Sequence, residues 1–222
     1  MTTAAERREA LVGLYRTLSE DWECPLRAGR THIVFGSGNA DADLMFVGEA
    51  PGANEDREGR PFVGRAGKLL DELLREIGLV RADTFIANVL KCRPPGNRDP
   101  RPEEIEECSP HLLRQIELIE PRIVCTLGNF ATKLLSASPQ GITKVHGRPQ
   151  TVTLGSHPVQ LYPIFHPAAA LRTEAMREGL REDFLRLPAL IEAARRPVAT
   201  EAAAPGEAAT PQAAAPQLDM FG

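Results

Sequence analysis

The sequence predicts an α/β protein whose sheet is mostly parallel and covered by helices on both faces. Short apolar stretches with the character of strands alternate along the chain with helical patterns. The strands are expected at 32–35, 43–47, 84–89, 122–127 and 159–165, and the helices at 4–20, 67–77, 102–119, 129–135 and 173–195. Strands that alternate with helices of this length favour a parallel sheet between two helical layers.

Local patterns justify the individual elements in turn. The helix at 4–20 repeats leucine on one face. The apolar run at 43–47 is typical of a short buried strand, and Gly48 and Pro51 impose a tight turn after it. The stretch at 122–127 contains Ile-Val-Cys-Thr-Leu, which is the pattern of a buried strand.

The chain has 222 residues, 42% of them hydrophobic and 25% charged, which fits one domain with a tail. We expect the domain at 1–196; residues 197–222 are rich in Ala and Pro without apolar periodicity, which predicts a disordered tether. No apolar run approaches the ~20 residues that span a bilayer, and the N-terminus lacks a signal-peptide core, so a cytoplasmic protein is expected. With a formal net charge of −4, any contact with nucleic acid must come from a local basic patch.

The most informative motif is Gly48-Glu49-Ala50-Pro51-Gly52, directly after the strand at 43–47. It holds a carboxylate at the carboxyl end of a strand, where open α/β sheets keep their ligand crevices. The stretch at 58–67 then adds glycines, two arginines and the ring of Phe62. A carboxylate, a ring and basic groups in one loop suggest an enzyme that acts on a planar, anionic substrate.

Four cysteines provide a second signal. Cys125 lies in the buried-strand pattern, where a small apolar core residue is the simpler interpretation. Cys24, Cys92 and Cys108 lie in loop-like or polar surroundings, which favours metal or cluster ligation over disulfides, with scattered free thiols as the alternative. A four-ligand cluster needs one more ligand. Asp21 stands three residues before Cys24, where a Cys-x-x-Cys pair would have its first cysteine.

Short motifs follow one another in a fixed order: Cys24-Pro-Leu, Gly29-Arg-Thr31, the motif at 48–52, Gly59-Arg-Pro-Phe-Val-Gly64, Asn88-Val-Leu-Lys-Cys-Arg-Pro-Pro95, Ile142-Thr-Lys144 and His166-Pro-Ala168. In this order and spacing the chain resembles the family-4, iron–sulfur uracil-DNA glycosylases over nearly all of residues 10–190. The resemblance implies a three-layer α/β/α sandwich around a four-stranded, mostly parallel sheet. It also implies a [4Fe–4S] cluster held by four cysteines, and excision of uracil from DNA.

The sequence departs from the family at one cluster ligand. The family's first cluster cysteine falls on Asp21, so the resemblance implies a cluster held by Asp21, Cys24, Cys92 and Cys108. An oxygen ligand should make this cluster more labile than one with four thiolates. The alternatives are a three-iron cluster or no cluster. Since the family's cluster lies away from the reaction centre, either would affect the stability of the protein or its docking on DNA more directly than the cleavage step.

An enzyme that excises uracil must flip the base into a pocket that reads it. The resemblance assigns Phe62 to stacking on the base and Asn88 to pairing with O4 and N3–H of uracil. It assigns His166 to donating a hydrogen bond to O2 as negative charge builds on the departing base. The alternatives are a core phenylalanine, a turn-capping asparagine and a structural histidine.

The two carboxylates, Glu49 and Glu55, each have more than one candidate role. Glu49 is expected to position the water nucleophile and to stabilise an oxocarbenium-like sugar, as carboxylates do in glycoside hydrolysis. The turn that begins at Gly48 can also hold the base through its backbone. Glu55 matches the family position near C5 of the base, where a side chain excludes the methyl of thymine; a solvated carboxylate is the alternative.

Several cations follow the predicted strands and are expected to form a phosphate-binding rim, although charge runs are often only solvated faces. These candidates are Arg60, Arg65, Lys144, Arg148 and Arg172. The segment at 167–172 resembles the family's minor-groove loop, which makes Leu171 a candidate wedge for the space that the flipped base leaves.

The chain ends in Gln217-Leu218-Asp-Met220-Phe221-Gly after the Ala/Pro tether. This spacing resembles the short peptide by which bacterial repair and replication proteins bind the sliding clamp. Apolar anchors on a tether need a partner groove. An incidental apolar terminus is the alternative.

These observations favour a monomeric, monofunctional uracil-DNA glycosylase that leaves an abasic site, since no lysine is placed as a Schiff-base nucleophile. One alternative is a catalytically weak scaffold of the same fold that binds DNA or the clamp. Another is a related glycosylase for hypoxanthine or xanthine. A covalent-trapping branch is set aside because the stretch at 59–67 lacks its basic, histidine-bearing insertion.

Overall fold

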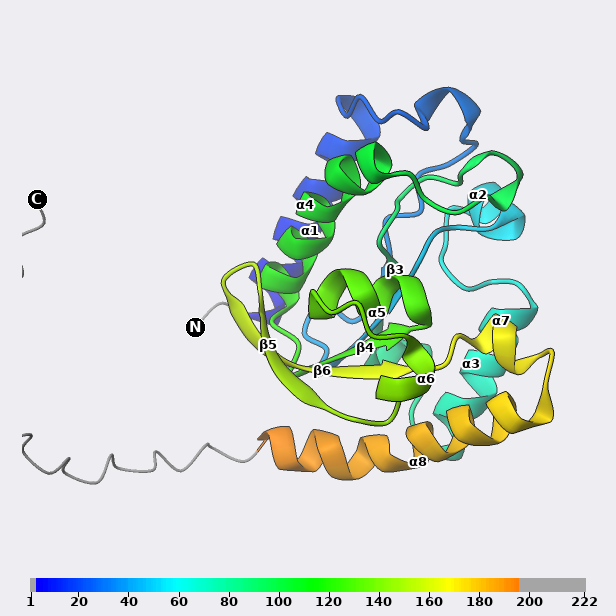
Figure 1. Cartoon of the computed structure of the whole chain (residues 1–222). Helices are drawn as coiled ribbons and strands as arrows, with labels where there is room; N and C mark the ends of the chain where they lie inside the picture. The colour runs from blue at the N-terminus through cyan, green and yellow to red at the C-terminus, as the bar shows by residue number, and fades with distance from the viewer. Residues whose placement is uncertain (1–2, 196–222) are drawn as a thin grey trace, which may run out of the picture.

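The computed structural model describes residues 3–195, which form a central sheet with helices on both faces (Figure 1). The sheet has six strands in the order β1-β3-β2-β4-β6-β5. Their bounds are Ser37–Gly38 (β1), Leu44–Gly48 (β2), Phe85–Asn88 (β3), Ile123–Leu127 (β4), Gln150–Leu154 (β5) and His157–Ile164 (β6).

The predicted α/β class is confirmed, but the expected sheet of four strands is wrong. β3, β2, β4 and β6 run parallel, and β1 and β5 pair antiparallel with the outer members of this set. The sheet is therefore six-stranded and mixed. β1 contributes two residues and β5 forms a hairpin with β6, so neither edge strand carries the apolar run that marks a buried parallel strand.

The longer helices are close to their predicted ranges, and three short ones were not predicted. The helices are Ala4–Glu20 (α1), Ala53–Glu58 (α2), Arg65–Glu76 (α3), Pro102–Ile119 (α4), Asn129–Ser136 (α5), Ile142–Val145 (α6), Pro167–Ala170 (α7) and Glu174–Arg195 (α8). Short 3-10 turns lie at Arg27–Gly29, Arg81–Asp83 and Pro95–Asn97. α2, α6 and α7 are too short to display a helical period in the sequence.

Alternation along β2 explains why the sheet is covered on both sides. Met45 and Val47 pack with α1, α4 and α5, whereas Leu44 and Phe46 pack with α3 and α8. Successive side chains of a strand point to opposite faces, so an apolar run buries both faces. The ring of Phe46 stacks on that of Phe184 in α8, with 5.6 Å between centroids. The two apolar clusters fix the sheet between two helical layers.

Two local predictions are corrected by the structure. Residues 32–35 form no strand; Val34 donates one backbone hydrogen bond to the Lys91 carbonyl at 2.8 Å, and the edge strand is β1. Cys108 lies within α4 and is fully buried, so its surroundings are not those of a polar loop. Cys125 is buried in β4, as predicted for a core residue.

Within 3–195, no helix is long and apolar enough to cross a membrane. The predicted tether at 197–222 lies outside the described residues. So do the candidate clamp-binding residues Gln217, Leu218, Met220 and Phe221.

Candidate active site

A pocket of about 510 Å³ lies at the carboxyl ends of β2, β3 and β6. This is the edge at which parallel sheets assemble ligand sites, because loops from neighbouring strands meet there. The pocket brings together most of the residues that the sequence selected for base recognition and catalysis: Glu49, Glu55, Phe62, Asn88 and His166. Arg172, from the loop after α7, also lines it.

Asn88 ends β3 with a buried side chain, and its Oδ1 has no hydrogen-bond partner within the described part of the chain. Gly48 makes this placement possible. A Cβ at position 48 would lie 2.4 Å from Asn88 Oδ1 and 2.7 Å from Cζ of Phe62. A buried acceptor without a donor is costly. An N–H group of a bound ligand would remove that cost.

Phe62 lies against this amide on a strained turn. Its backbone adopts a φ of 53°, which non-glycine residues rarely adopt. The Arg81 guanidinium donates to the carbonyls of Pro61 and Phe62 and stabilises the turn. Gly67 leaves room for the same turn, because a Cβ there would lie 1.7 Å from the Phe62 carbonyl oxygen. The fold thus holds the ring in one place at the pocket wall.

Glu55 supports the same loop. Its Oε1 accepts hydrogen bonds from the backbone N–H groups of Val63 at 2.9 Å and Gly64 at 3.0 Å. The carboxylate therefore fixes the chain just after Phe62 while it lines the pocket. Exclusion of thymine by Glu55 stays a prediction.

His166 caps the short helix α7 at the end of β6. Its Nδ1 accepts a hydrogen bond from the Ala168 N–H at 3.0 Å, which places the proton of the neutral ring on Nε2. Burial lowers the pKa of His166 to about 4, so the ring is neutral at pH 7. The rings of His166 and Phe62 lie 5.7 Å apart, centroid to centroid. The site therefore offers a neutral N–H donor beside a stacking ring.

Glu49 is half-buried at the end of β2, and burial, reinforced by the charge of Asp99, raises the pKa of its carboxyl. Asn97 and Arg98 also line the pocket, and Asn97 was not selected from the sequence. Arg98 also pairs with the buried carboxylate of Glu104 at the start of α4. Both come from the Pro-Pro-Gly-Asn-Arg stretch, whose prolines and glycine were the available signal for an ordered loop beside the site.

The three candidate cluster cysteines converge at one place. The thiols of Cys108 and Cys92 lie near enough to the Cys24 sulfur to lower the pKa of that thiol. Arg30 donates from Nη1 to the Cys92 sulfur at 3.3 Å. Three buried sulfurs beside a guanidinium form a donor set that suits three positions of a cysteine-ligated cluster.

The expected fourth cluster ligand, Asp21, has different surroundings from the three cysteines. Asp21 is the C-cap of α1 and is exposed, whereas the three cysteines are buried. Among residues 3–195, no group of three or more His, Cys, Asp and Glu side chains is arranged to hold a single metal ion. Ligation by Asp21 stays a prediction.

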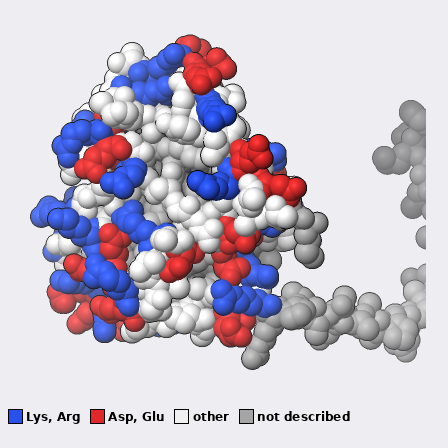
Figure 2. All heavy atoms as spheres, turned by 180° about the vertical axis from the view of Figure 1, so that it is seen from behind, with Lys and Arg blue, Asp and Glu red and all other residues white. Residues whose placement is uncertain are grey.

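The candidate DNA-contacting side chains are all exposed: Arg60, Arg65, Lys144, Arg148, Leu171 and Arg172. Arg60 lies 3.6 Å from the carboxylate of Glu58. On the face drawn in Figure 2, basic and acidic side chains intermingle along the margins around a largely uncharged centre. That face presents no broad basic surface, in keeping with the net charge of −4.

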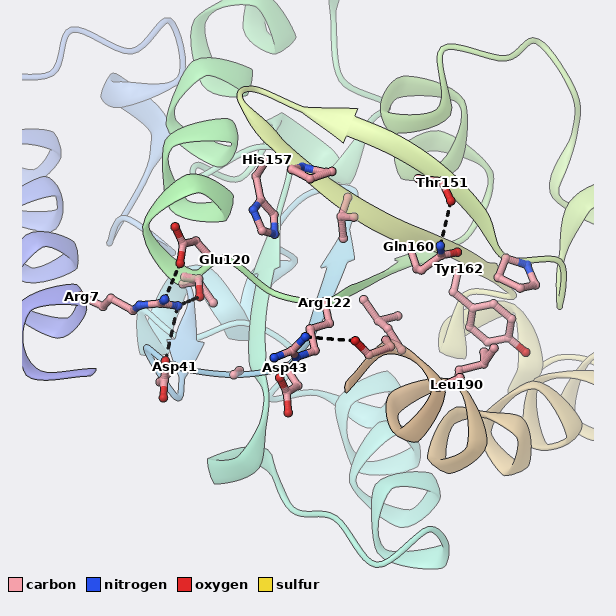
Figure 3. Close-up of a pocket in the computed structure, with 18 residues that line it drawn as sticks. Arg7, Asp41, Asp43, Glu120, Arg122, Thr151, His157, Gln160, Tyr162 and Leu190 are labelled. Atoms are coloured by element: carbon pink, nitrogen blue, oxygen red, sulfur yellow. Dashed lines mark hydrogen bonds and ion pairs between the residues drawn. The ribbon is translucent and has the colours of Figure 1, made fainter. Parts of the chain in front are cut away.

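A larger cavity of about 810 Å³ lies at the opposite edge, where the parallel strands begin (Figure 3). Internal ion pairs cross it: Arg7 lies 3.4 Å from Asp41, and Arg122 lies 2.9 Å from Asp43. None of the predicted site residues among those described lines it. Size alone therefore does not identify the functional pocket.

Comparison with known proteins identifies the family of this chain. Residues 35–187 match the family model described as the uracil DNA glycosylase superfamily. A type-4 uracil-DNA glycosylase of Sulfurisphaera tokodaii is 49% identical over 170 residues, covering 74% of this chain and 77% of that protein. The type-4 enzyme of Saccharolobus solfataricus is 50% identical over 167 residues, with coverage of 73% and 77%.

A third relative, the type-4 uracil-DNA glycosylase of Archaeoglobus fulgidus, is 44% identical over 183 residues. The match covers 81% of this chain and 92% of that protein. It therefore extends over nearly the whole of the relative. The chain belongs to the uracil-DNA glycosylase superfamily and, within it, to the type-4 uracil-DNA glycosylases.

Proposed function

We propose that this protein is a monofunctional uracil-DNA glycosylase of base excision repair. It flips uracil out of DNA and hydrolyses the N-glycosidic bond, leaving an abasic site. The observation that carries this assignment is the buried Oδ1 of Asn88, without a partner in residues 3–195, beside the Phe62 ring and the His166 donor. The type-4 relatives, at 44–50% identity, support the same activity.

Recognition of uracil follows from donors and acceptors. Asn88 Oδ1 accepts the uracil N3–H, and its Nδ2 donates to O4, while the ring of Phe62 stacks on the base. Cytosine presents an acceptor at N3 and a donor at N4, so both contacts become repulsive. The Asn88 amide therefore selects uracil over cytosine.

Cleavage of the glycosidic bond develops negative charge on uracil and positive charge on the sugar. The C1′–N1 bond breaks with its electron pair leaving on uracil, and the Nε2–H of His166 donates to O2 as that charge develops. Glu49 positions the water that adds to C1′, and its negative charge stabilises the oxocarbenium-like sugar. The proton of that water passes to the carboxylate or to solvent. A backbone contact from the turn at Gly48 helps to hold the base.

DNA is held by exposed cations around the carboxyl edge of the sheet. Arg60, Arg65, Lys144, Arg148 and Arg172 contact phosphates, and Leu171 occupies the space of the flipped base. Leu171 is 43% exposed directly after α7, which suits a wedge. Because the net charge is negative, this rim is a local feature.

We further propose a [4Fe–4S] cluster held by Cys24, Cys92 and Cys108, with Asp21 as its fourth ligand. The convergence of the three buried sulfurs supports it. The cluster is structural in this proposal and takes no part in the glycosidic step. We also propose that the protein is a monomer whose residues 217–222, outside the described part, bind the bacterial sliding clamp.

The test is base release from an oligonucleotide with a single uracil, measured alongside DNA binding by the same preparation. Free uracil and an alkali-labile site, without strand cleavage before alkali, are expected. Matched oligonucleotides with thymine or cytosine should release nothing. DNA binding without base release, even with enzyme in excess, would contradict the enzyme and favour a DNA-binding scaffold.

A further inference from the structure

Lys91 lies between the cysteine site and the asparagine that reads the base. It is fully buried, three residues after Asn88 and one before Cys92. Its Nζ donates to the Asn88 carbonyl oxygen at 2.8 Å and to Gln115 Oε1 at 2.6 Å. Gln115 in turn donates from Nε2 to the Phe35 carbonyl at 2.9 Å. The ammonium is thus fixed by a chain of hydrogen bonds that ends on two backbone carbonyls.

These oxygen partners are neutral, so they do not balance the charge of a buried ammonium. Such a group is stable in a protein interior only near negative charge. The sulfurs of Cys92 and Cys108 lie near enough to Lys91 to interact with its charge, and both are thiolates when they hold a cluster. Lys91 also directly precedes Cys92 in the chain. It is therefore linked to the cysteine site through both its main chain and its charge.

The same short segment is tied to the base pocket. Val89 donates to the Gly48 carbonyl at 2.9 Å, and Leu90 donates to the Glu49 carbonyl at 3.0 Å. The stretch between Asn88 and Cys92 is therefore hydrogen-bonded to the turn that carries Glu49. These hydrogen bonds connect a displacement at the cysteine end to Asn88.

We propose that Lys91 is a positioning residue that couples the iron–sulfur site to uracil recognition, an inference that rests on the cluster proposed above. Its ammonium is the counter-charge of the cysteine-held cluster, and its hydrogen bond fixes the Asn88 main chain. Occupation of the base pocket and retention of iron then stabilise the same arrangement of residues 88–92. Binding at either site must favour binding at the other.

The coupling is measured as the rate at which a chelator removes iron from anaerobically purified full-length protein. One sample contains an oligonucleotide with 2′-fluoro-2′-deoxyuridine, which resists hydrolysis, and its control contains thymidine at that position. In the wild type, the uracil analogue should slow iron release about fivefold or more relative to the thymidine control. This comparison requires no variant.

The substitution Lys91→Met keeps the length of the side chain and removes its charge and donor. It should release iron faster than the wild type and bring the ratio between the two oligonucleotides to one. Lys133→Met, at an exposed lysine of α5, is the matched control and should keep the wild-type ratio.

Three results would overturn the inference. One is an equal response of iron-loaded wild type to both oligonucleotides, and another is a full ratio retained in Lys91→Met. Protein that releases uracil but contains no iron would remove the cluster, and the coupling with it, while leaving the glycosylase activity in place. Failure of the coupling is thereby separated from failure of the proposed function.

Discussion

Gly48 and Asn88 approach so closely that a Cβ at position 48 would lie 2.4 Å from Asn88 Oδ1. The two residues pair across β2 and β3 at the last position of both strands. The base-reading amide therefore depends on the absence of a side chain on the neighbouring strand. This relationship explains why a glycine opens the motif at 48–52.

Gly48→Ala should lower kcat/KM for uracil release by about 10²-fold or more, because the added methyl displaces both the Asn88 amide and the Phe62 ring. Single-turnover kinetics on a uracil oligonucleotide measures this. Gly13→Ala is the matched control, since a Cβ at Gly13 meets nothing within 4 Å. Equal activity of the two variants would show that the pocket tolerates a side chain at 48.

Asn88→Asp should weaken discrimination between uracil and cytosine by about 10- to 100-fold, because the carboxylate loses the donor to O4. Release of both bases from otherwise identical oligonucleotides measures the ratio. Unchanged selectivity would remove Asn88 from the recognition site.

Glu55→Ala distinguishes two roles for that carboxylate. It removes the acceptor for the N–H groups of Val63 and Gly64, so the loop after Phe62 loosens and uracil release should fall by about tenfold or more. If Glu55 also excludes the thymine methyl, a T:G oligonucleotide becomes a substrate. Full uracil activity in the variant would contradict the supporting role.

His166 should make stability depend on pH. Its folded pKa, about 4, is below its ordinary value of 6.5, so the unfolded chain binds more protons between these values. This contribution is fully present above pH 6.5 and is lost as the pH falls towards 4. His166→Asn keeps a capping side chain without a titrating ring. Urea unfolding at pH 7 and pH 5 should show a smaller loss of stability in the variant than in the wild type. Equal losses would contradict the account.

Phe221→Ala should abolish binding to a bacterial sliding clamp, because it removes an apolar anchor of the proposed motif. Activity on short oligonucleotides should not change. Binding to surface-immobilised clamp measures the first effect, and base release from short oligonucleotides measures the second. Clamp binding that survives the substitution would show that 217–222 is not the contact.

The sequence predicted the elements with strong periodicity and missed those without it. α4 was predicted at its observed bounds because its apolar period is unbroken over several turns. β5 was missed because its residues alternate between partly buried and exposed and form only an edge hairpin. α7 was missed because its four residues, Pro-Ala-Ala-Ala, are too few to show a period; His166 caps its N-terminus.

The sequence identified several residues of the site but not the contacts between them. Motifs identified Asn88, Phe62 and His166, and the pocket contains all three. Nothing in the sequence indicated that Glu55 supports the Phe62 loop or that Lys91 is buried beside Asn88, because both depend on hydrogen bonds between segments. Long-range contacts of this kind carry no local signal.

The proposed function depends most directly on acceptance of the uracil N3–H by the buried Oδ1 of Asn88. The most direct measurement compares release of uracil and N3-methyluracil from otherwise identical oligonucleotides. We expect release of uracil and no detectable release of N3-methyluracil, since the methyl group removes the donor and collides with Asn88. Comparable rates for the two bases would contradict it.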